Sequence, residues 1–405
     1  MLAHVHCSRS RFLSLLCLAF ASLCLLAGCT GSPTTSGTPK PTASVVGSAT
    51  ASATPTTPAS SASTIYVGSA DHSLYALNAS DGRVRWKFQT GDAITSQPVI
   101  ADGRVYVAST DHFVYAVSAA TGQQVWRAEV GWYPSLSPVV NGTLFVSADP
   151  GVWALDAVSG TVRWHNEELH NAQTPVVAGG LVYVSGVDSG VDVLLALGMS
   201  DGVVRWHFSA GSYTQNFFNT PVIVSDTLYA SNGNGYVYAF GASDGSLRWK
   251  TQLIHVVPGL SPLAVADGVV YVGGGNSASD YRLFALSAAN GGSLWSAKTD
   301  GYISTPRVSG GTLYLKEHLY NTGDGIDTYC YALHATDGSQ IWRAPLGLAM
   351  ELVTSMLMLT PPVLMDGTIY VGSDDHGIYA LNASGGSMRW RTDVNRNMSA
   401  LLVAS

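Results

Sequence analysis

Charged residues are scarce in this chain, and positive charge is not in excess. Asp, Glu, Lys and Arg make up 12% of its 405 residues, and 27 acidic against 20 basic residues give a formal net charge of −7. A protein that binds nucleic acid through its phosphates needs a basic surface. We therefore expect no nucleic acid among the partners of this protein.

A long hydrophobic run is also missing. The apolar stretch Phe12–Leu26 follows two arginines and is too short for a comfortable membrane span. It ends in Leu26-Ala27-Gly28-Cys29, which resembles the lipobox of bacterial lipoproteins. The resemblance implies that residues 1–28 are a signal peptide cleaved before Cys29, and that the thiol of Cys29 is lipidated. The alternative is an ordinary signal peptide that happens to carry a cysteine.

Lipidation would determine where the protein works. Two or more acyl chains anchor a protein stably, so we expect an extracytoplasmic protein held at a bacterial membrane through the lipid on Cys29 alone. In the segment Thr30–Ser63 that follows, 31 of 34 residues are Thr, Ser, Pro, Ala or Gly. Such a composition cannot bury enough apolar area to fold. Residues 29–63 are therefore predicted to be the lipidated cysteine and a disordered linker.

Cysteine is too rare to cross-link the remainder of the chain. Of the five cysteines, cleavage before Cys29 would leave only Cys29 and Cys330. With Cys29 lipidated, no pair remains for a disulfide, and we expect Cys330 to be a small core residue. A C-x-x-C-H haem site is absent as well.

What the chain has in abundance is a repeat. Eight segments carry Ala, then Gly at the seventh position and Trp at the eleventh, and neighbouring tryptophans are 38 to 48 residues apart. A period of this length indicates a propeller, a solenoid or an array. The tryptophans of the repeat are Trp86, Trp126, Trp164, Trp206, Trp249, Trp295, Trp342 and Trp390.

Each unit has the two-residue period of β-strands. Three short strands, as in "RVYVAS", "FVYAVSA" and "QVWRAEV", are separated by turn residues, and a fourth begins near a proline. Proline belongs at the start of a strand or on an edge strand, because it cannot donate to the ladder. The prolines are Pro98, Pro138, Pro175, Pro221, Pro262, Pro306 and Pro362. Four antiparallel strands per unit, repeated radially, form a β-propeller.

The two ends of the chain complement each other. The first unit begins at Ile65 without a proline strand, and Ser399–Ala404 is an apolar strand without a unit of its own. We expect this C-terminal strand to be the innermost strand of blade one, which closes the ring and removes its open edge. The predicted fold is all-β, a monomeric eight-bladed propeller of four-stranded antiparallel blades over residues 64–405.

The repeat resembles the tryptophan-docking motif of the quinoprotein propellers, the PQQ-like repeat family. It is found in eight of eight units, and the chain contains no Trp-Asp dipeptide of the WD type. The resemblance implies a structural role for the tryptophans, each indole wedging between neighbouring blades beside the small Ala and a Gly-containing turn. With the lipobox, it also implies similarity to the propeller lipoprotein of outer-membrane β-barrel assembly.

Catalytic members of this family use adjacent cysteines and an Asp with Glu and Asn around calcium. No adjacent cysteine pair exists in the chain, and no position takes over the catalytic Asp. We therefore expect no catalytic residue, metal or cofactor. The alternative is an oxidoreductase similar to the PQQ-dependent dehydrogenases, with PQQ and calcium.

Three Asp-His dipeptides and one polar segment offer metal-ligand chemistry. Asp71-His72, Asp111-His112 and Asp375-His376 each fall in the hairpin between second and third strands, where turn chemistry explains the Asp without a metal. Asn321–Tyr329 has oxygen ligands but does not fit the calcium-loop pattern. We interpret it as a long polar hairpin.

The connections between blades are unusually apolar for loops. We expect them to gather on one face, around the mouth of the channel, and to bind a peptide or protein segment; the alternative is that they plug the channel. The candidate binding residues are Trp132, Tyr133, Tyr213, Phe217, Phe218, His255, Tyr302 and Met350. The predicted function is a non-enzymatic protein-binding scaffold or sensor module on the outer side of the membrane. Exposed Trp and Tyr also leave carbohydrate binding in the cell wall open.

Overall fold

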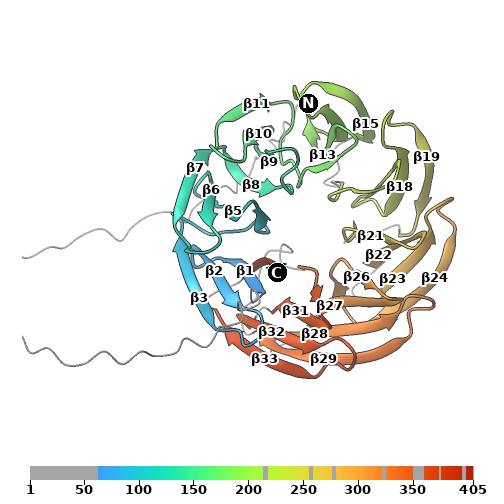
Figure 1. Cartoon of the computed structure of the whole chain (residues 1–405). Helices are drawn as coiled ribbons and strands as arrows, with labels where there is room; N and C mark the ends of the chain where they lie inside the picture. The colour runs from blue at the N-terminus through green and yellow to red at the C-terminus, as the bar shows by residue number, and fades with distance from the viewer. Residues whose placement is uncertain are drawn as a thin grey trace, which may run out of the picture. The chain divides into compact units, whose positions relative to one another are not determined.

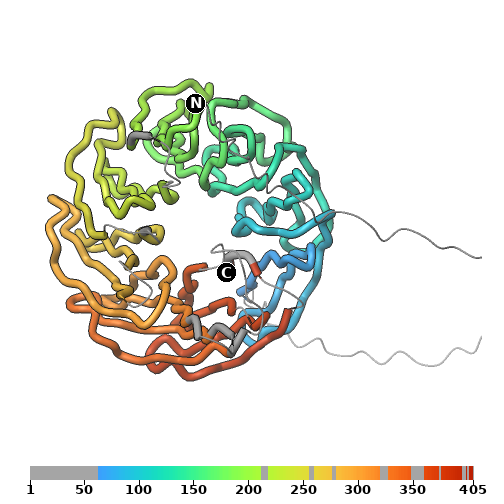
Figure 2. The backbone as a smooth tube through the Cα atoms, turned by 180° about the vertical axis from the view of Figure 1, so that it is seen from behind, coloured from blue at the N-terminus to red at the C-terminus, as the bar shows by residue number. Residues whose placement is uncertain are grey.

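The computed structural model describes residues 63–212, 218–254, 259–275, 280–321, 325–349, 360–373, 375–394 and 398–404. In these residues the regular secondary structure consists of strands, which form eight antiparallel sheets. The sheets follow one another in chain order around a closed ring (Figures 1 and 2). The prediction of an all-β, eight-bladed propeller is confirmed. The described residues include no helix with the length and apolar character needed to cross a membrane.

The strands of blades one to four are listed from the innermost outward. Blade one has β34 (Met398–Ala404), β1 (Thr64–Ser69), β2 (Ser73–Asn78) and β3 (Val84–Gln89). Blade two has β4 (Val99–Ala101), β5 (Arg104–Ala108), β6 (Phe113–Ser118) and β7 (Gln124–Glu129). Blade three has β8 (Trp132–Leu136), β9 (Thr143–Asp149), β10 (Val152–Asp156) and β11 (Val162–Asn166). Blade four has β12 (Val176–Ala178), β13 (Leu181–Asp188), β14 (Val191–Gly198) and β15 (Val204–Ser212).

Blades five to eight continue the ring, and in blades six and seven two short strands share the innermost position. Blade five has β16 (Val222–Val224), β17 (Thr227–Ser231), β18 (Tyr236–Gly241) and β19 (Leu247–Gln252). Blade six has β20 (Gly259–Leu260), β21 (Ala264–Ala266), β22 (Val269–Gly275), β23 (Tyr281–Ser287) and β24 (Ser293–Thr299). Blade seven has β25 (Tyr302–Ile303), β26 (Arg307–Ser309), β27 (Thr312–Asn321), β28 (Gly325–His334) and β29 (Gln340–Ala349). Blade eight has β30 (Val363–Met365), β31 (Thr368–Gly372), β32 (Gly377–Asn382) and β33 (Met388–Asp393).

The C-terminal strand closes the ring as predicted. β34 pairs antiparallel with β1, so that Ile65 faces Val403 and Val67 faces Leu401. The first and last strands of the described chain thus contribute to one sheet. The inner edge of β1, which would otherwise present unpaired backbone groups, is covered.

Proline keeps most innermost strands short. β4, β12, β16 and β30 have three residues each and begin directly after or close to a proline. Blade three differs, because its innermost strand β8 ends before Pro138, and Val140 then makes only an isolated bridge with Thr143. We expected the residues after Pro138 to pair with β9. The segment before Pro138, strand β8, pairs with β9 instead.

The core lies between neighbouring blades. The second and third strands of a blade are buried along nearly their whole length, whereas the outermost strand alternates between exposed and partly buried residues. Alternate side chains of one sheet therefore pack on the next sheet. In the cluster between blades one and two, Trp86 and Phe88 of β3 pack against Val105 and Val107 of β5.

Candidate functional site

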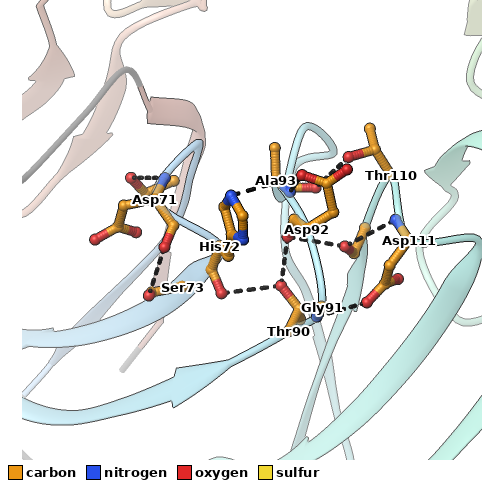
Figure 3. Close-up of polar contacts among 11 residues, drawn as sticks. Asp71, His72, Ser73, Thr90, Gly91, Asp92, Ala93, Thr110 and Asp111 are labelled. Atoms are coloured by element: carbon orange, nitrogen blue, oxygen red, sulfur yellow. Dashed lines mark hydrogen bonds and ion pairs between the residues drawn. The ribbon is translucent and has the colours of Figure 1, made fainter. Parts of the chain in front are cut away.

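Two kinds of connection lie at one end of the blades, and we call the described part of this end the connection face. It consists of the hairpins between second and third strands, such as 70–72 and 109–112, and the links from an outermost strand to the next blade, such as 90–98. The two kinds touch each other in Figure 3. Thr90 donates from its backbone N to the carbonyl of His72 at 2.8 Å. Gly91 donates to Oδ2 of Asp111 at 2.7 Å.

The Asp-His hairpins on this face are held by a tyrosine four residues after each aspartate. Tyr115 donates to Asp111 at 2.6 Å, and Tyr379 donates to Asp375 at 2.5 Å. Tyr75 donates to Asp71 in the same way. The three histidines that follow the aspartates are in the left-handed region, with φ of 66° to 77°.

The pKa values in these hairpins agree with a structural role for the Asp–Tyr hydrogen bonds. Burial raises the pKa of Asp71, but the hydrogen bonds from Tyr75 and Ser69 outweigh it and leave the pKa lowered overall. Burial and the hydrogen bond to Asp111 raise the pKa of Tyr115 to about 12. Asp71 therefore stays charged and Tyr115 stays neutral near pH 7. In the part of the chain that the structure describes, no group of three or more His, Cys, Asp or Glu is placed to hold a metal ion.

Two aromatic side chains stand out on the connection face. Trp132 is 57% exposed and Tyr133 is 72% exposed. The ring of His112, from the hairpin of blade two, packs edge-on against Trp132 with centroids 3.8 Å apart. Tyr133 is in the left-handed region, with φ of 50°. The pair thus presents two aromatic rings to solvent from a fixed backbone.

The expectation that this segment is a loop was wrong. Trp132 and Tyr133 begin strand β8, and Trp132 faces Asp149 of β9 with an irregular register before Ser135. Ladder formation with β9 satisfies backbone groups that a loop would leave to solvent. Tyr302 likewise lies in a strand, β25, partly buried against Tyr281 with ring centroids 4.4 Å apart.

Phe218 does not belong to an exposed surface. It is 1% exposed and packs against Phe208 and Tyr238 in the core between blades four and five. Because the whole ring is removed from water, Phe218 stabilises the core and is not available to a binding partner. Tyr213, Phe217, His255 and Met350 of the predicted binding face, and Cys29, lie outside the described residues.

The eight tryptophans of the repeat bridge successive blades. Each indole Nε1 donates to a backbone carbonyl of the following blade at 3.0–3.2 Å, and Trp390 donates back to blade one. The pairs are Trp86 with Ala119, Trp126 with Ala157, Trp164 with Met199, Trp206 with Ala242, Trp249 with Ala288, Trp295 with Ala335, Trp342 with Ala383 and Trp390 with Ala79. Their contribution to stability stays a prediction.

The sequence analysis missed a second aromatic residue that shares the carbonyl with most of the indoles. In seven blades a tyrosine of the second strand donates to the same carbonyl, at 2.9–3.5 Å. These residues are Tyr66, Tyr106, Tyr183, Tyr229, Tyr271, Tyr314 and Tyr370. Blade three has Phe145 at this position, which keeps the ring and lacks the hydroxyl. Aligning the eight units in the sequence would have found this aromatic position.

Blade seven contains buried charges that the sequence analysis also overlooked. Lys316 and Glu317 of β27 are each 1% exposed. Lys316 Nζ donates to the carbonyl of Gly372 in blade eight at 3.2 Å. Cys330, opposite Lys316 on β28, is fully buried, in keeping with a core residue.

Eight sheets joined by indoles in this way define a PQQ-like β-propeller. The chain belongs to the family described as outer membrane protein assembly factor BamB, whose model matches residues 36–131, 110–323, 213–351 and 326–405.

Proteins of this family are among its relatives. The outer membrane protein assembly factor BamB of Yersinia pestis is 25% identical over 66% of this chain and 69% of its own length. That of Escherichia coli K12 is 29% identical over 79% of this chain and 70% of its own. The serine/threonine-protein kinase AfsK of Streptomyces griseus is 28% identical over 62% of this chain, which spans only 29% of the kinase.

Solved structures share the fold. The crystal structure of BamB from Moraxella catarrhalis superposes with a TM-score of 0.59 at 19% identity, covering 79% of this chain and 91% of that one. The quinohemoprotein alcohol dehydrogenase of Comamonas testosteroni also gives 0.59, at 14% identity, covering 84% and 72%. At these identities the likeness concerns the fold alone.

Proposed function

We propose that this protein is a non-enzymatic, protein-binding scaffold of the cell envelope, and that it docks a peptide or protein segment on its connection face. The observation that carries the proposal is the exposed pair Trp132 and Tyr133. Among the described residues, these are the aromatic side chains that remain largely in solvent, at 57% and 72% exposure.

Their chemistry favours a partner over a purely structural role. Large aromatic rings gain free energy by leaving water, and Trp and Tyr are enriched at the centres of protein interfaces. Strand pairing of β8 with β9 holds Trp132 opposite Asp149, and Tyr133 follows directly in the irregular part of the same ladder, which limits the backbone entropy lost on binding.

The relatives support a binding module in the same way. The assembly factors that match this chain are named for outer-membrane protein assembly, and AfsK carries a matching region as part of a longer kinase. A propeller that recurs in an assembly factor and in a kinase is consistent with a portable binding or sensor unit. We extend the proposal to anchoring: residues 1–28 as signal peptide, the lipid on Cys29, the linker over 29–63 and an extracytoplasmic location.

A photo-crosslinking experiment tests the docking surface. A photoreactive phenylalanine analogue would be placed at Tyr133 and, as a matched control, at Val158, which is 60% exposed in a hairpin at the other end of blade three. We expect a discrete crosslinked protein from position 133 in intact cells and none from position 158. Equal crosslinking from both positions, or none from 133, would contradict the proposal.

The redox alternative is tested separately on the same protein. We expect no saturable binding of pyrroloquinoline quinone, with or without calcium, and no dye-linked alcohol oxidation. Binding with turnover would make the protein an oxidoreductase and would redirect attention to carboxylates near the ring axis.

A further inference from the structure

Blade seven departs from the repeat at two buried positions. Lys316 and Glu317 follow Tyr314 by two and three residues, and the corresponding positions of the other blades hold small residues or an asparagine. Blades one, two and eight, for example, have serine where blade seven has Glu317. Burying a carboxylate costs free energy unless the charge is paired, so the buried position of Glu317 needs a physical explanation.

Only one oxygen of Glu317 accepts hydrogen bonds from the backbone. Oε1 accepts them from the backbone N of Asp300 at 2.8 Å and of Gly301 at 3.1 Å. Oε2 is buried and has no hydrogen-bond partner of good geometry. The phenol of Tyr331 lies beside this carboxylate, and burial together with the interaction with Glu317 raises the pKa of Tyr331. The nearest cation, Arg343, is 3.9 Å from Oε2, beyond hydrogen-bond distance.

Arg343 is held away from Glu317 by its other contacts. Its guanidinium lies 3.6 Å from the centroid of the Tyr329 ring and 5.1 Å from that of Tyr331. It is also 3.9 Å from Oδ2 of Asp300, so its charge is shared between two carboxylates. The guanidinium therefore compensates Glu317 only in part.

Glu317 lines a cavity between blades six and seven, which we call the blade 6–7 cavity. Its volume is about 210 Å³. This is many times the 10–15 Å³ or so that one water molecule needs, and less than the ~300 Å³ at which pockets for drug-sized ligands begin. The lining residues are Ala297, Lys298, Thr299, Asp300, Leu315, Glu317, Tyr331, Leu333, Gly338 and Gln340.

The lining suits a small hydrogen-bond donor with an apolar part. The lining residues, one lysine and two carboxylates, have a formal charge of 1 − 2 = −1, which Arg343 beside them brings to −1 + 1 = 0. The carboxylate is still the strongest acceptor of the lining, and its hydrogen bonds are strongest with an ionised donor. Leu315, Leu333 and Ala297 offer apolar walls to an alkyl chain. A divalent metal needs several carboxylate or imidazole ligands, and the residues described here provide no group of three. An ammonium needs only one carboxylate and one or two neutral acceptors.

We propose that the blade 6–7 cavity binds a primary ammonium group on a short alkyl chain, with Oε2 of Glu317 accepting its hydrogen bond. The ammonium belongs either to a lysine side chain of a partner protein or to a free small amine. Asp300 of the lining lies in a link of the connection face, but the cavity is between blades six and seven, whereas Trp132 and Tyr133 belong to blade three. The proposal does not depend on docking at that aromatic pair.

Calorimetric titration of the full chain tests the site. The probes are n-butylammonium, the neutral isostere n-butanol, 1,5-diaminopentane and Nα-acetyl-lysinamide. We expect saturable binding of butylammonium and none of butanol. Glu317→Gln, which keeps the shape of the side chain, should weaken butylammonium binding by about tenfold or more, the loss expected for one hydrogen bond to a charged group. Asp71→Asn, which changes a partly buried acid of blade one, is the matched control and should leave binding unchanged.

The outcomes separate the two sources of the amine and the failure of the proposal. Acetyl-lysinamide binding at least as tightly as the diamine indicates a partner's lysine, and tighter diamine binding indicates a free amine. Equal binding of butanol and butylammonium, or of Glu317→Gln and the natural chain, would overturn the proposal and leave a water-filled cavity. If Glu317→Gln does not fold, the pH dependence of the natural chain decides: butylammonium binding should disappear above about pH 10.4 as the amine loses its proton. Butylammonium binding that persists above this pH would contradict the proposed ammonium site.

Discussion

At the scale of single residues, the interface between two blades is built around one glycine and one indole. Gly122 has φ of +72°, and a Cβ added there would lie 2.8 Å from the ring of Trp86. The indole donates to Ala119 only three residues earlier, so ring and turn are fitted to each other. The repeat spacing of Ala, Gly and Trp thus encodes a contact between blades, because the Gly of one unit receives the Trp of the preceding unit.

A pair of glycine substitutions tests this contact. Gly103→Ala should cost about 1–2 kcal/mol of unfolding free energy, from the left-handed backbone alone. Its φ is +70° and a Cβ there would meet nothing within 4 Å. Gly122→Ala carries the same backbone cost and in addition forces Trp86 to move, which should add about 1–3 kcal/mol. Urea unfolding measures both. Equal losses for the two variants would show that the indole contact contributes little to stability.

At the scale of the element, the blades differ in how their polar hairpins are held. In blade five the hairpin between β16 and β17 is tied to the outermost strand β19. Arg248 donates to Oδ2 of Asp226 at 2.7 Å and to Thr227 at 2.5 Å. The hydrogen bond from Arg248 lowers the pKa of Asp226 to about 2. The hairpin is therefore tied most firmly while this carboxylate is ionised.

This interaction should depend on pH. Because the folded-state pKa lies below the unfolded value of about 3.9, the stabilisation is fully present above about pH 4 and is lost as the pH falls toward 2. Asp226→Asn should lower the melting temperature at pH 6, with a smaller difference from the natural chain at pH 3. Asp102→Asn in the corresponding hairpin of blade two, where the described residues offer no ion pair, is the control. A difference that stays the same at both pH values would contradict the prediction.

At the scale of the whole molecule, ring closure depends on seven residues at the C-terminal end of the described chain. β34 covers the inner edge of β1 and buries Met398 and Leu401 in the core between blades eight and one. Trp390 then joins blade eight to the carbonyl of Ala79 in blade one. The first and last units of the sequence are thus neighbours in the ring.

Ending the chain at Asn397 tests the closure. The truncated protein loses two buried side chains and exposes a strand edge, so we expect a loss of more than about 4 kcal/mol and a tendency to associate. A synthetic peptide of residues 398–405 should restore much of the stability by strand addition. Leu401→Ala in the full chain separates the packing contribution from that of the strand. An unchanged urea midpoint after truncation would mean that the ring does not depend on β34.

Much of this architecture was predictable because it rests on local regularities. The repeat of Ala, Gly and Trp, the two-residue period of the strands and the prolines at their starts specify eight blades without any long-range information. Even the closing strand followed from an apolar segment without a unit of its own. The candidate site was less predictable: Trp132 and Phe218 both looked like apolar loop residues, yet one is exposed on a strand and the other is buried. The sequence shows that a segment is rich in aromatic residues, but it does not show which of their rings are buried by neighbouring blades.

The sequence by itself therefore determined the number of blades, their strand order and the residue spacing that joins them, because each blade repeats the same short-range pattern. Only the tertiary structure decided which indole meets which carbonyl, which aromatic rings stay in solvent, and that the buried Glu317 borders a cavity. Those features depend on contacts between residues of different blades. The repeat encodes that an indole meets the next blade, whereas Glu317 is visible in the sequence only as a departure from the repeat.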